Sequence, residues 1–151
     1  MPSPHAPQSA TVPFPPAPLW RRLAAMLYDS LLVVALWMIV GAIAVAVNGG
    51  EATGGPLFNS ALFLITFLFF GLFWTRSGQT LGMMAWRLRV ETEQGQGISW
   101  MQALLRFFTA AAAALFVGLG YWWMLFDKQQ RTWQDRYSET RVVLLPKRPK
   151  A

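Results

Sequence analysis

The chain has 151 residues and a mean hydropathy of +0.34, with 54% hydrophobic but only 13% charged residues. A soluble domain needs a larger polar shell, so this composition excludes that class and predicts an integral membrane protein. The formal net charge of +6 fits basic residues on the cytoplasmic flanks of membrane segments, and we expect no nucleic-acid partner. Cysteine is absent, which excludes a disulfide framework and a thiolate metal site.

The chain begins with a proline-rich leader, residues 1–18, which contains seven of the ten prolines and neither Lys nor Arg. This composition predicts a disordered or polyproline segment. It differs from a signal peptide, which starts with positive charge before an apolar stretch. A solvated leader and a segment that binds a proline-recognising partner both remain open. We expect one membrane domain at residues 19–145, followed by a basic C-terminal tail at 146–151.

Two hydrophobic runs, residues 23–47 and 57–74, are each long enough to cross a bilayer as a helix. Trp20, Arg21 and Arg22 precede the first run as an interfacial and cytoplasmic anchor. The glycine-rich connector between the runs contains no Lys or Arg, so it should face outward. We therefore expect a multi-pass protein of the plasma (bacterial inner) membrane with a cytoplasmic N-terminus.

The pattern changes after the second run. A polar, glycine-flanked turn that would seat the chain at the membrane interface contains Gly78, Gln79, Thr80 and Gly82. A short apolar stretch, residues 83–86, follows and could lie in the interface. Residues 87–92 alternate polar and apolar with a period of two, which predicts a short strand. Residues 140–145 are a second strand candidate, which Pro146 ends.

The third hydrophobic segment, residues 103–126, could either cross the membrane or bend and return. A run of this length more commonly crosses. Crossing would place the seven basic residues that follow it outside, against the positive-inside bias. Returning keeps all 13 basic residues cytoplasmic and lets the two strand candidates meet, so we favour it. The fold class is then an all-α membrane protein with two to four transmembrane or re-entrant helices and a small cytoplasmic β-hairpin or strand pair.

Asp29 lies inside the first hydrophobic run, where lipid offers no water to a carboxylate. It must therefore be neutral, paired with a cation, or beside a polar path. Arg22 stands seven residues earlier, which on a helix gives nearly the same direction about 10 Å away along the axis. Arg106, at the start of the third segment, is the partner that we predict for Asp29. For Asp135, in a stretch of mixed charge, we expect a helix cap or a cytoplasmic salt bridge.

Several short motifs, taken in order, resemble the RDD family of small membrane proteins. They are Arg22-Leu23-Ala24-Ala25-Met26-Leu27-Tyr28-Asp29, Gly78-Gln79-Thr80-Leu81-Gly82, Arg87-Leu88-Arg89-Val90, Ala103-Leu104-Leu105-Arg106, Trp133-Gln134-Asp135-Arg136 and Thr140-Arg141-Val142-Val143. The resemblance covers roughly residues 19–145, and the Arg and two Asp of the family name correspond to Arg22, Asp29 and Asp135. The chain departs from the pattern at Gln134, because members often carry a His just before the final Asp. The resemblance implies transport of ions or other ligands, with cation/proton antiport proposed for some members.

Two functions are compatible with these residues. In the first, Asp29 exchanges a proton for a monovalent cation or binds a small ligand, with Arg22 and Arg106 tuning it in a homo-oligomer. In the second, the same polar residues are structural, and the protein is a non-transporting interaction or assembly factor for other membrane proteins. We expect no enzyme, because the sole histidine, His5, lies in the leader and no serine has a base beside it. We likewise expect no cofactor and no metal.

Overall fold

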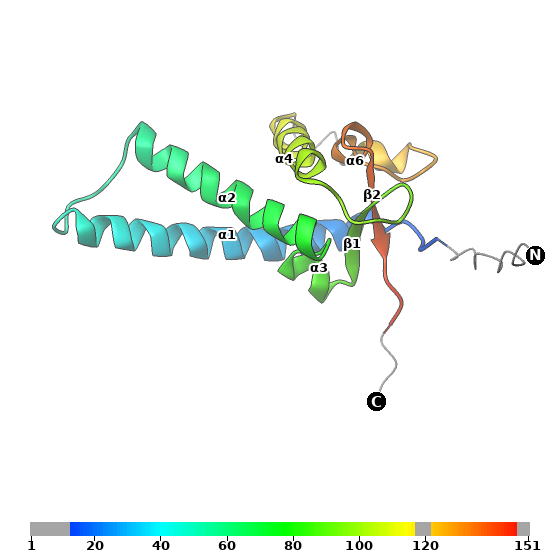
Figure 1. Cartoon of the computed structure of the whole chain (residues 1–151), viewed down its shortest axis with the longest axis horizontal. Coiled ribbons are helices and arrows are strands. Elements are labelled where there is room, and N and C mark those ends of the chain that lie inside the picture. Colours follow the sequence, from blue (N-terminus) through cyan, green and yellow to red (C-terminus); the bar gives the residue numbers. More distant parts are fainter. Residues whose placement is uncertain (1–12, 117–121, 148–151) are drawn as a thin grey trace, which may run out of the picture.

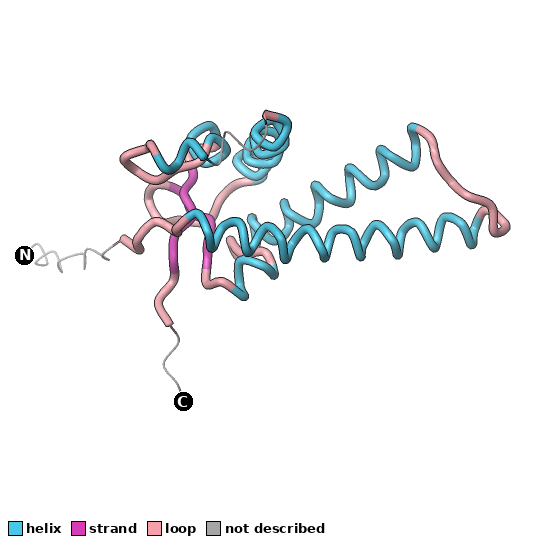
Figure 2. Tube along the Cα trace, turned by 180° about the vertical axis from the view of Figure 1, so that it is seen from behind, coloured by secondary structure: helices cyan, strands magenta, loops and turns pink. Residues whose placement is uncertain are grey.

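The computed structural model describes residues 13–116 and 122–147 of the chain. Most of the predicted leader and tail, residues 1–12 and 148–151, therefore lies outside the described residues. Figure 1 shows a long helical hairpin that is joined, at the end opposite its connecting loop, to a smaller unit of short helices and two strands. The same arrangement is seen from behind in Figure 2.

The hairpin consists of α1, Leu19–Val47, and α2, Pro56–Arg76. Both helices are long and apolar enough to cross a membrane, with lengths of about 43 and 31 Å at 1.5 Å per residue. Large apolar side chains are exposed along both of them, which is typical of helices whose surroundings are lipid. The two predicted spans are thus confirmed as helices, and each helix extends a little beyond its predicted bounds.

A small antiparallel sheet lies beside the first turns of α1. Its strands are β1, Leu88–Thr92, and β2, Thr140–Leu144, and Val90 stands opposite Val142 in the register. Both strands agree with the period-two patterns of the sequence, so the predicted strand pair is confirmed.

The free edge of β2 is covered by the chain that leads into α1. The Ala17 amide donates to the Val142 carbonyl at 3.0 Å, and the Leu144 amide donates to the Pro15 carbonyl at 2.9 Å. Ala17 is completely buried. The last residues of the predicted leader are therefore not a solvated segment. They form hydrogen bonds with backbone groups at the edge of β2 that would otherwise lack a partner.

The predicted third segment forms α4, Trp100–Leu115, and the 3-10 turn η1, Trp123–Leu125, with residues 117–121 outside the described part. Ser99 and Gln102 form a capping box at the start of α4. The Ser99 hydroxyl accepts from the Gln102 backbone amide at 3.2 Å, and the Gln102 side-chain oxygen accepts from the Ser99 backbone amide at 2.9 Å. The 16 residues of α4 span only about 24 Å, against about 30 Å for a hydrocarbon core. The strands that precede and follow this segment are paired, so the chain returns from Thr92 to Thr140 directly opposite.

Two five-residue helices complete the small unit: α3, Leu81–Ala85, and α6, Trp133–Tyr137. The hydrophobic core lies where the hairpin meets the sheet, and its buried members include Ala25, Trp74, Met83, Leu88, Val90, Ile98, Ala103 and Val142. A second set of buried residues is polar or charged and lies against this core. These polar residues come from α1, the turn before α3, α4, α6 with its two cap residues, and the strands. They form the site described next.

Candidate functional site

Asp135 is the centre of a buried ion cluster. It lies on α6 with no exposed surface, and its two carboxylate oxygens accept from different arginines. Arg22 Nη1 donates to Asp135 Oδ2 at 2.6 Å, and Arg106 Nη1 donates to Asp135 Oδ1. The carboxylate thus joins α1, α4 and α6. Both contacts expected for Asp135 are present: it forms salt bridges in the interior of the small unit, and its carboxylate also accepts from the Thr132 amide at 3.4 Å in the capping box of α6.

Backbone carbonyls hold the Arg22 guanidinium in place. Its Nε donates to the Ala17 carbonyl at 3.2 Å, and its Nη2 donates to the carbonyls of Gln130 and Val142 at 3.2 and 3.3 Å. With the bond to Asp135, each of its three nitrogens has a partner. Arg22 is only 6% exposed, so this network meets the requirement that a buried charge be both paired and hydrogen-bonded.

Arg106 binds the other carboxylate oxygen of Asp135. Its Nη1 also donates to Thr140 Oγ1 at 2.7 Å, and its guanidinium carbon lies 5.2 Å from the centre of the Trp74 ring. A cation over an indole face gains further electrostatic stabilisation. Arg106 therefore connects α4 to α2 as well as to α6 and β2.

The two arginines control the titration of Asp135. Burial alone would raise its pKa, because the charged carboxylate loses its hydration. The positive charges of Arg22 and Arg106, and the hydrogen bonds that they donate, outweigh burial and lower the pKa of Asp135 from 3.8 to about 2. Asp135 is therefore ionised throughout the physiological pH range, and the cluster stays intact there.

Asp29 is buried on α1, but the prediction that it pairs with Arg106 is wrong. Thr80 Oγ1 donates to Asp29 Oδ2, and the Gly82 amide donates to Asp29 Oδ1 at 2.9 Å. No arginine or lysine within the described ranges forms a salt bridge with Asp29. Arg22 also contacts Asp135 instead of Asp29, so the two aspartates of the sequence motif occupy separate polar sites.

The predicted turn at residues 78–82 is the structure that receives Asp29. Gly78 has a φ of +70°, and its carbonyl accepts from the Val90 amide at 2.7 Å. Thr80 is the N-cap of α3 and accepts from the Met83 amide at 3.2 Å. A Cβ on Gly82 would overlap the Ala25 carbonyl of α1 and lie 2.9 Å from the Asp29 carboxylate. The turn therefore seats α3 directly against α1.

Gln79, the remaining residue of the predicted turn motif, points to the sheet. Its side-chain amide donates to the Leu88 carbonyl at 2.6 Å. With the bond between Gly78 and Val90, this contact attaches the turn to β1. The four turn residues thus have structural partners on two sides, Asp29 on α1 and the backbone of β1.

A cavity of about 230 Å³ separates Asp29 from the ion cluster. Ten of its 16 lining residues are apolar or aromatic, and the other six are Arg22, Asp29, Ser30, Thr80, Arg106 and Gln134. Three buried polar atoms of lining residues have no hydrogen-bond partner among the described residues: Trp74 Nε1, Arg106 Nε and Gln134 Oε1. Because orphaned buried polar atoms cost free energy, such a cavity favours a polar occupant, from water to a small solute.

Three residues that matter here were missed by the sequence reasoning. Glu91 is buried and binds Arg89 at 2.9 Å and Arg141 at 2.6 Å. The signal for the first contact was present, since residues two apart on a strand share a face. Trp74 and Gln134 gave no such signal, because their role depends on a cavity formed by distant segments.

Comparison with known proteins gives one match. The family model described as the RDD family matches residues 16–139, which is most of the chain. No curated protein and no solved structure is significantly similar to the chain. The match includes the motif residues Arg22, Asp29 and Asp135, in agreement with the resemblance given by the sequence motifs.

Proposed function

We propose a transport function for this chain, which belongs to the RDD family: a small ion or polar ligand enters the cavity beside Asp29 and is exchanged for a proton. The observation that supports this proposal most directly is the 230 Å³ cavity, three of whose lining residues each have a buried polar atom without a partner among the described residues. Two buried donors and one buried acceptor offer hydrogen bonds that the described part of the chain leaves unused. Intramembrane polar sites of this kind are typical of substrate and proton pathways.

Asp29 is the proposed exchanging group. Asp135 is held between two arginines, whereas Asp29 accepts its hydrogen bonds from neutral donors, Thr80 and Gly82. A carboxylate without a guanidinium partner can accept a proton or a monovalent cation without first breaking an ion pair. In this proposal Arg106 lies across the cavity and limits how much positive charge can accumulate there.

The proposed setting is a multi-pass protein in the bacterial inner membrane with its small unit on the cytoplasmic side. Arg21 and Arg22 begin α1, Arg76 ends α2, and residues 48–55 between the helices contain no Lys or Arg. The pairing of β1 with β2 supports a third segment that returns instead of crossing. Since two spans cannot enclose a pathway, we propose that the transporting form is a homo-oligomer.

The test is an Asp29→Asn variant in proteoliposomes that contain a pH-sensitive dye. The introduced side chain could still accept from the Gly82 amide through its carbonyl oxygen, and the Thr80 hydroxyl could turn to accept from its amide group. The variant therefore keeps the shape of the site and loses only the titratable group. We expect pulses of Na⁺, K⁺ or Li⁺ to drive proton movement in the wild type and at least tenfold less in the variant.

An Asp127→Asn variant is the matched control. The Asp127 carboxylate accepts from the Arg131 amide at 3.1 Å and does not line the cavity, so the same chemical change is made elsewhere. We expect wild-type exchange from this control. Wild-type exchange from Asp29→Asn as well would contradict the proposed role of Asp29.

The second candidate function is an assembly or interaction factor without transport or catalysis. The observation that favours it is the use of both aspartates as internal connectors, Asp135 for α1, α4 and α6, and Asp29 for α3. In that case Asp29→Asn would reduce accumulation of the protein in the membrane, measured by immunoblot. Normal accumulation together with lost exchange would instead support transport.

A further inference from the structure

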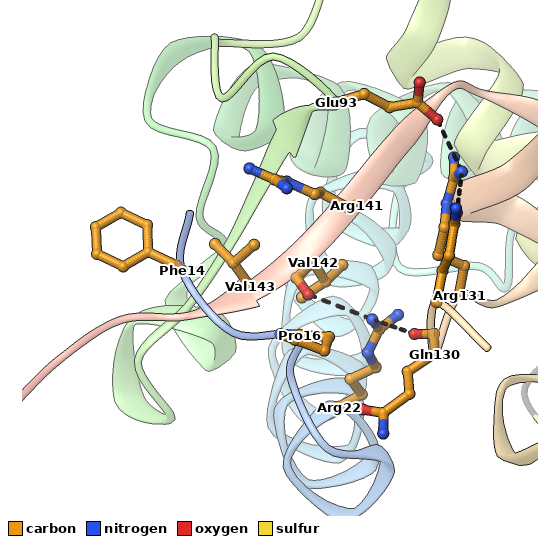
Figure 3. A pocket seen from close by; sticks show the side chains of 10 residues that line it. Phe14, Pro16, Arg22, Glu93, Gln130, Arg131, Arg141, Val142 and Val143 are labelled. Carbon is orange, nitrogen blue, oxygen red and sulfur yellow. Dashed lines mark hydrogen bonds and ion pairs between the residues drawn. The ribbon is translucent and has the colours of Figure 1, made fainter. Parts of the chain in front are cut away.

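A second cavity, of about 400 Å³, shares the lining residues Arg22 and Val142 with the first. Figure 3 shows it surrounded by three arginine side chains: Arg22 at the bottom of the view, Arg131 at the right and Arg141 above. They come from α1, from the loop before α6 and from β2. Phe14, Pro16 and Val143 form an apolar side of the same cavity.

The charges around this cavity are not balanced. Two buried carboxylates are each shared by two arginines: Asp135 by Arg22 and Arg106, and Glu91 by Arg89 and Arg141. Each of these triads therefore carries one uncompensated positive charge. The cavity lies between them, because Arg22 of one triad and Arg141 of the other both line it.

A third arginine completes the lining without removing this excess. Arg131 Nη1 pairs with Glu93 at 2.8 Å, which makes a neutral pair, and the Glu93 side chain is half exposed. Arg131 Nη2 donates to the carbonyls of Asp135 and Thr140, both at 3.0 Å. Its Nε is buried and has no acceptor among the described residues.

The guanidinium groups are also fixed before any ligand arrives. Backbone carbonyls hold Arg22 and Arg131, while Glu91 holds both Nε and Nη2 of Arg141. Fixed guanidiniums lose little side-chain entropy when they bind an anion. The carbonyl oxygens orient Arg22 and Arg131 without adding negative charge, so the single excess positive charge of each triad remains.

We propose that this cavity binds a phosphate group, either the headgroup of an anionic lipid or phosphate free in solution. A phosphate at neutral pH carries up to two negative charges, which matches the two uncompensated triads. It can also accept several hydrogen bonds, and among the described residues Arg131 Nε and Arg141 Nη1 are donors without a partner. The cavity volume accommodates a phosphate ester. Its position at the start of α1 corresponds to the membrane surface in the proposed orientation, where lipid phosphates lie.

The experiment is a binding titration of the full chain in neutral maltoside micelles. Three probes are compared at constant ionic strength: inorganic phosphate, dihexanoylphosphatidic acid and, as zwitterionic control, dihexanoylphosphatidylcholine. Calorimetry gives the affinity, and the shift of the thermal midpoint gives an independent measure of binding to the folded state. We expect saturable binding of at least one anionic probe and none of the control.

Two variants change the charge of the cavity in opposite directions. Arg141→Gln should weaken phosphate binding about tenfold, because it removes one charge-assisted contact. Glu93→Gln should tighten phosphate binding a few-fold, because the substitution removes the negative charge that Glu93 contributes to the cavity lining. Arg136→Gln is the matched control: this arginine is exposed, forms no salt bridge within the described residues and does not line the cavity. We expect it to bind within twofold of wild type.

The outcomes separate the two sources of phosphate. At least tenfold tighter binding of the phosphatidic acid than of inorganic phosphate assigns the site to a lipid, and comparable affinities assign it to soluble phosphate. The proposal is overturned if neither probe saturates, if Arg136→Gln weakens binding as much as Arg141→Gln, or if Glu93→Gln weakens it. If Arg141→Gln does not fold, the Glu93→Gln variant still tests the proposal, because tighter phosphate binding supports it and weaker binding contradicts it.

Discussion

At Asp135, one carboxylate faces two guanidinium groups in a site without solvent exposure. Removing one member of a buried ion cluster leaves the others as unpaired buried charges, which commonly costs about 3 to 5 kcal/mol. The loss at Asp135 should lie in this range, because both Arg22 and Arg106 would be left with an excess of charge. The residue therefore matters more for the folded state than its position in a short polar helix indicates.

The pH dependence of stability should report this cluster. The pKa of Asp135 is about 2 in the folded protein against 3.8 without the fold. Because the folded value is the lower one, the stabilisation is complete above the unfolded pKa and is lost as the pH falls through about 2. The difference corresponds to a stabilisation on the order of 2 kcal/mol.

We expect the free energy of unfolding in micelles to be about 3 kcal/mol higher for wild type than for Asp135→Asn at pH 7. This gap should narrow by about 2 kcal/mol between pH 5 and pH 2, because wild type loses a stabilisation that the variant lacks. Denaturant titrations at several pH values measure it. A gap that is constant over this range would contradict the role given to the ionised carboxylate.

Asp29 illustrates what single residues in the sequence could and could not predict. Its position inside a hydrophobic run indicated burial and the need for a polar partner, and it is only 3% exposed. The predicted partner, Arg106, was wrong, because helix periodicity identifies neighbours on the same helix but not contacts between distant segments. The actual partner, Thr80, lies 51 residues later in the sequence. It belongs to the turn at residues 78–82, which the sequence predicted as a seat at the membrane interface and not as a partner of Asp29.

Among the elements, the two strands were predictable, whereas their surroundings were not. Alternation of polar and apolar residues is a local property, so it identified both β1 and β2. The register of Val90 with Val142, and the cover that Pro15 and Ala17 give to the β2 edge, depend on tertiary packing. The proline-rich composition of the leader gave no signal that its last residues would pair with a strand.

The contact between α3 and α1 gives a prediction at this scale. An added Cβ at Gly82 would overlap the Ala25 carbonyl and crowd the Asp29 carboxylate, so Gly82→Ala must push α3 away from α1. We expect a loss of about 1 to 3 kcal/mol in the free energy of unfolding, typical of overpacking. Denaturant unfolding of the purified protein in micelles is the measurement.

Gly97→Ala serves as the control for this substitution. A Cβ there has no atom within 4 Å in the described structure, and we expect its stability to stay within about 0.5 kcal/mol of wild type. Equal stability of the Gly82 and Gly97 variants would show that α3 does not depend on a close backbone approach.

For the whole molecule, hydropathy could not decide whether the third segment crosses the membrane. It is long enough to do so, and only the charge distribution argued against it. The structure adds two facts that are global: α4 has only 16 residues, and the strands before and after it are paired. The strand pairing is the fact that supports the returning third segment of the proposed topology.

Reporter fusions measure this arrangement. A fluorescent protein fused after Ala151 should fluoresce in the cytoplasm, and alkaline phosphatase fused at Gly50, in the connector between α1 and α2, should be active outside. The connector fusion is the internal control, because the side of the membrane on which it lies depends only on the orientation of α1. Phosphatase activity from a fusion after Ala151 would mean that the third segment crosses.

The bond between Arg22 and Asp135 joins residues that are 113 positions apart. At about 5 to 20 residues per second, a ribosome needs on the order of ten seconds to make the intervening chain. During biosynthesis the carboxylate that pairs with Arg22 is therefore added well after α1 has been made. A product that ends before Asp135 would lack the carboxylate that pairs with Arg22 and with Arg106, and the cluster that joins α1, α4 and α6 could not form.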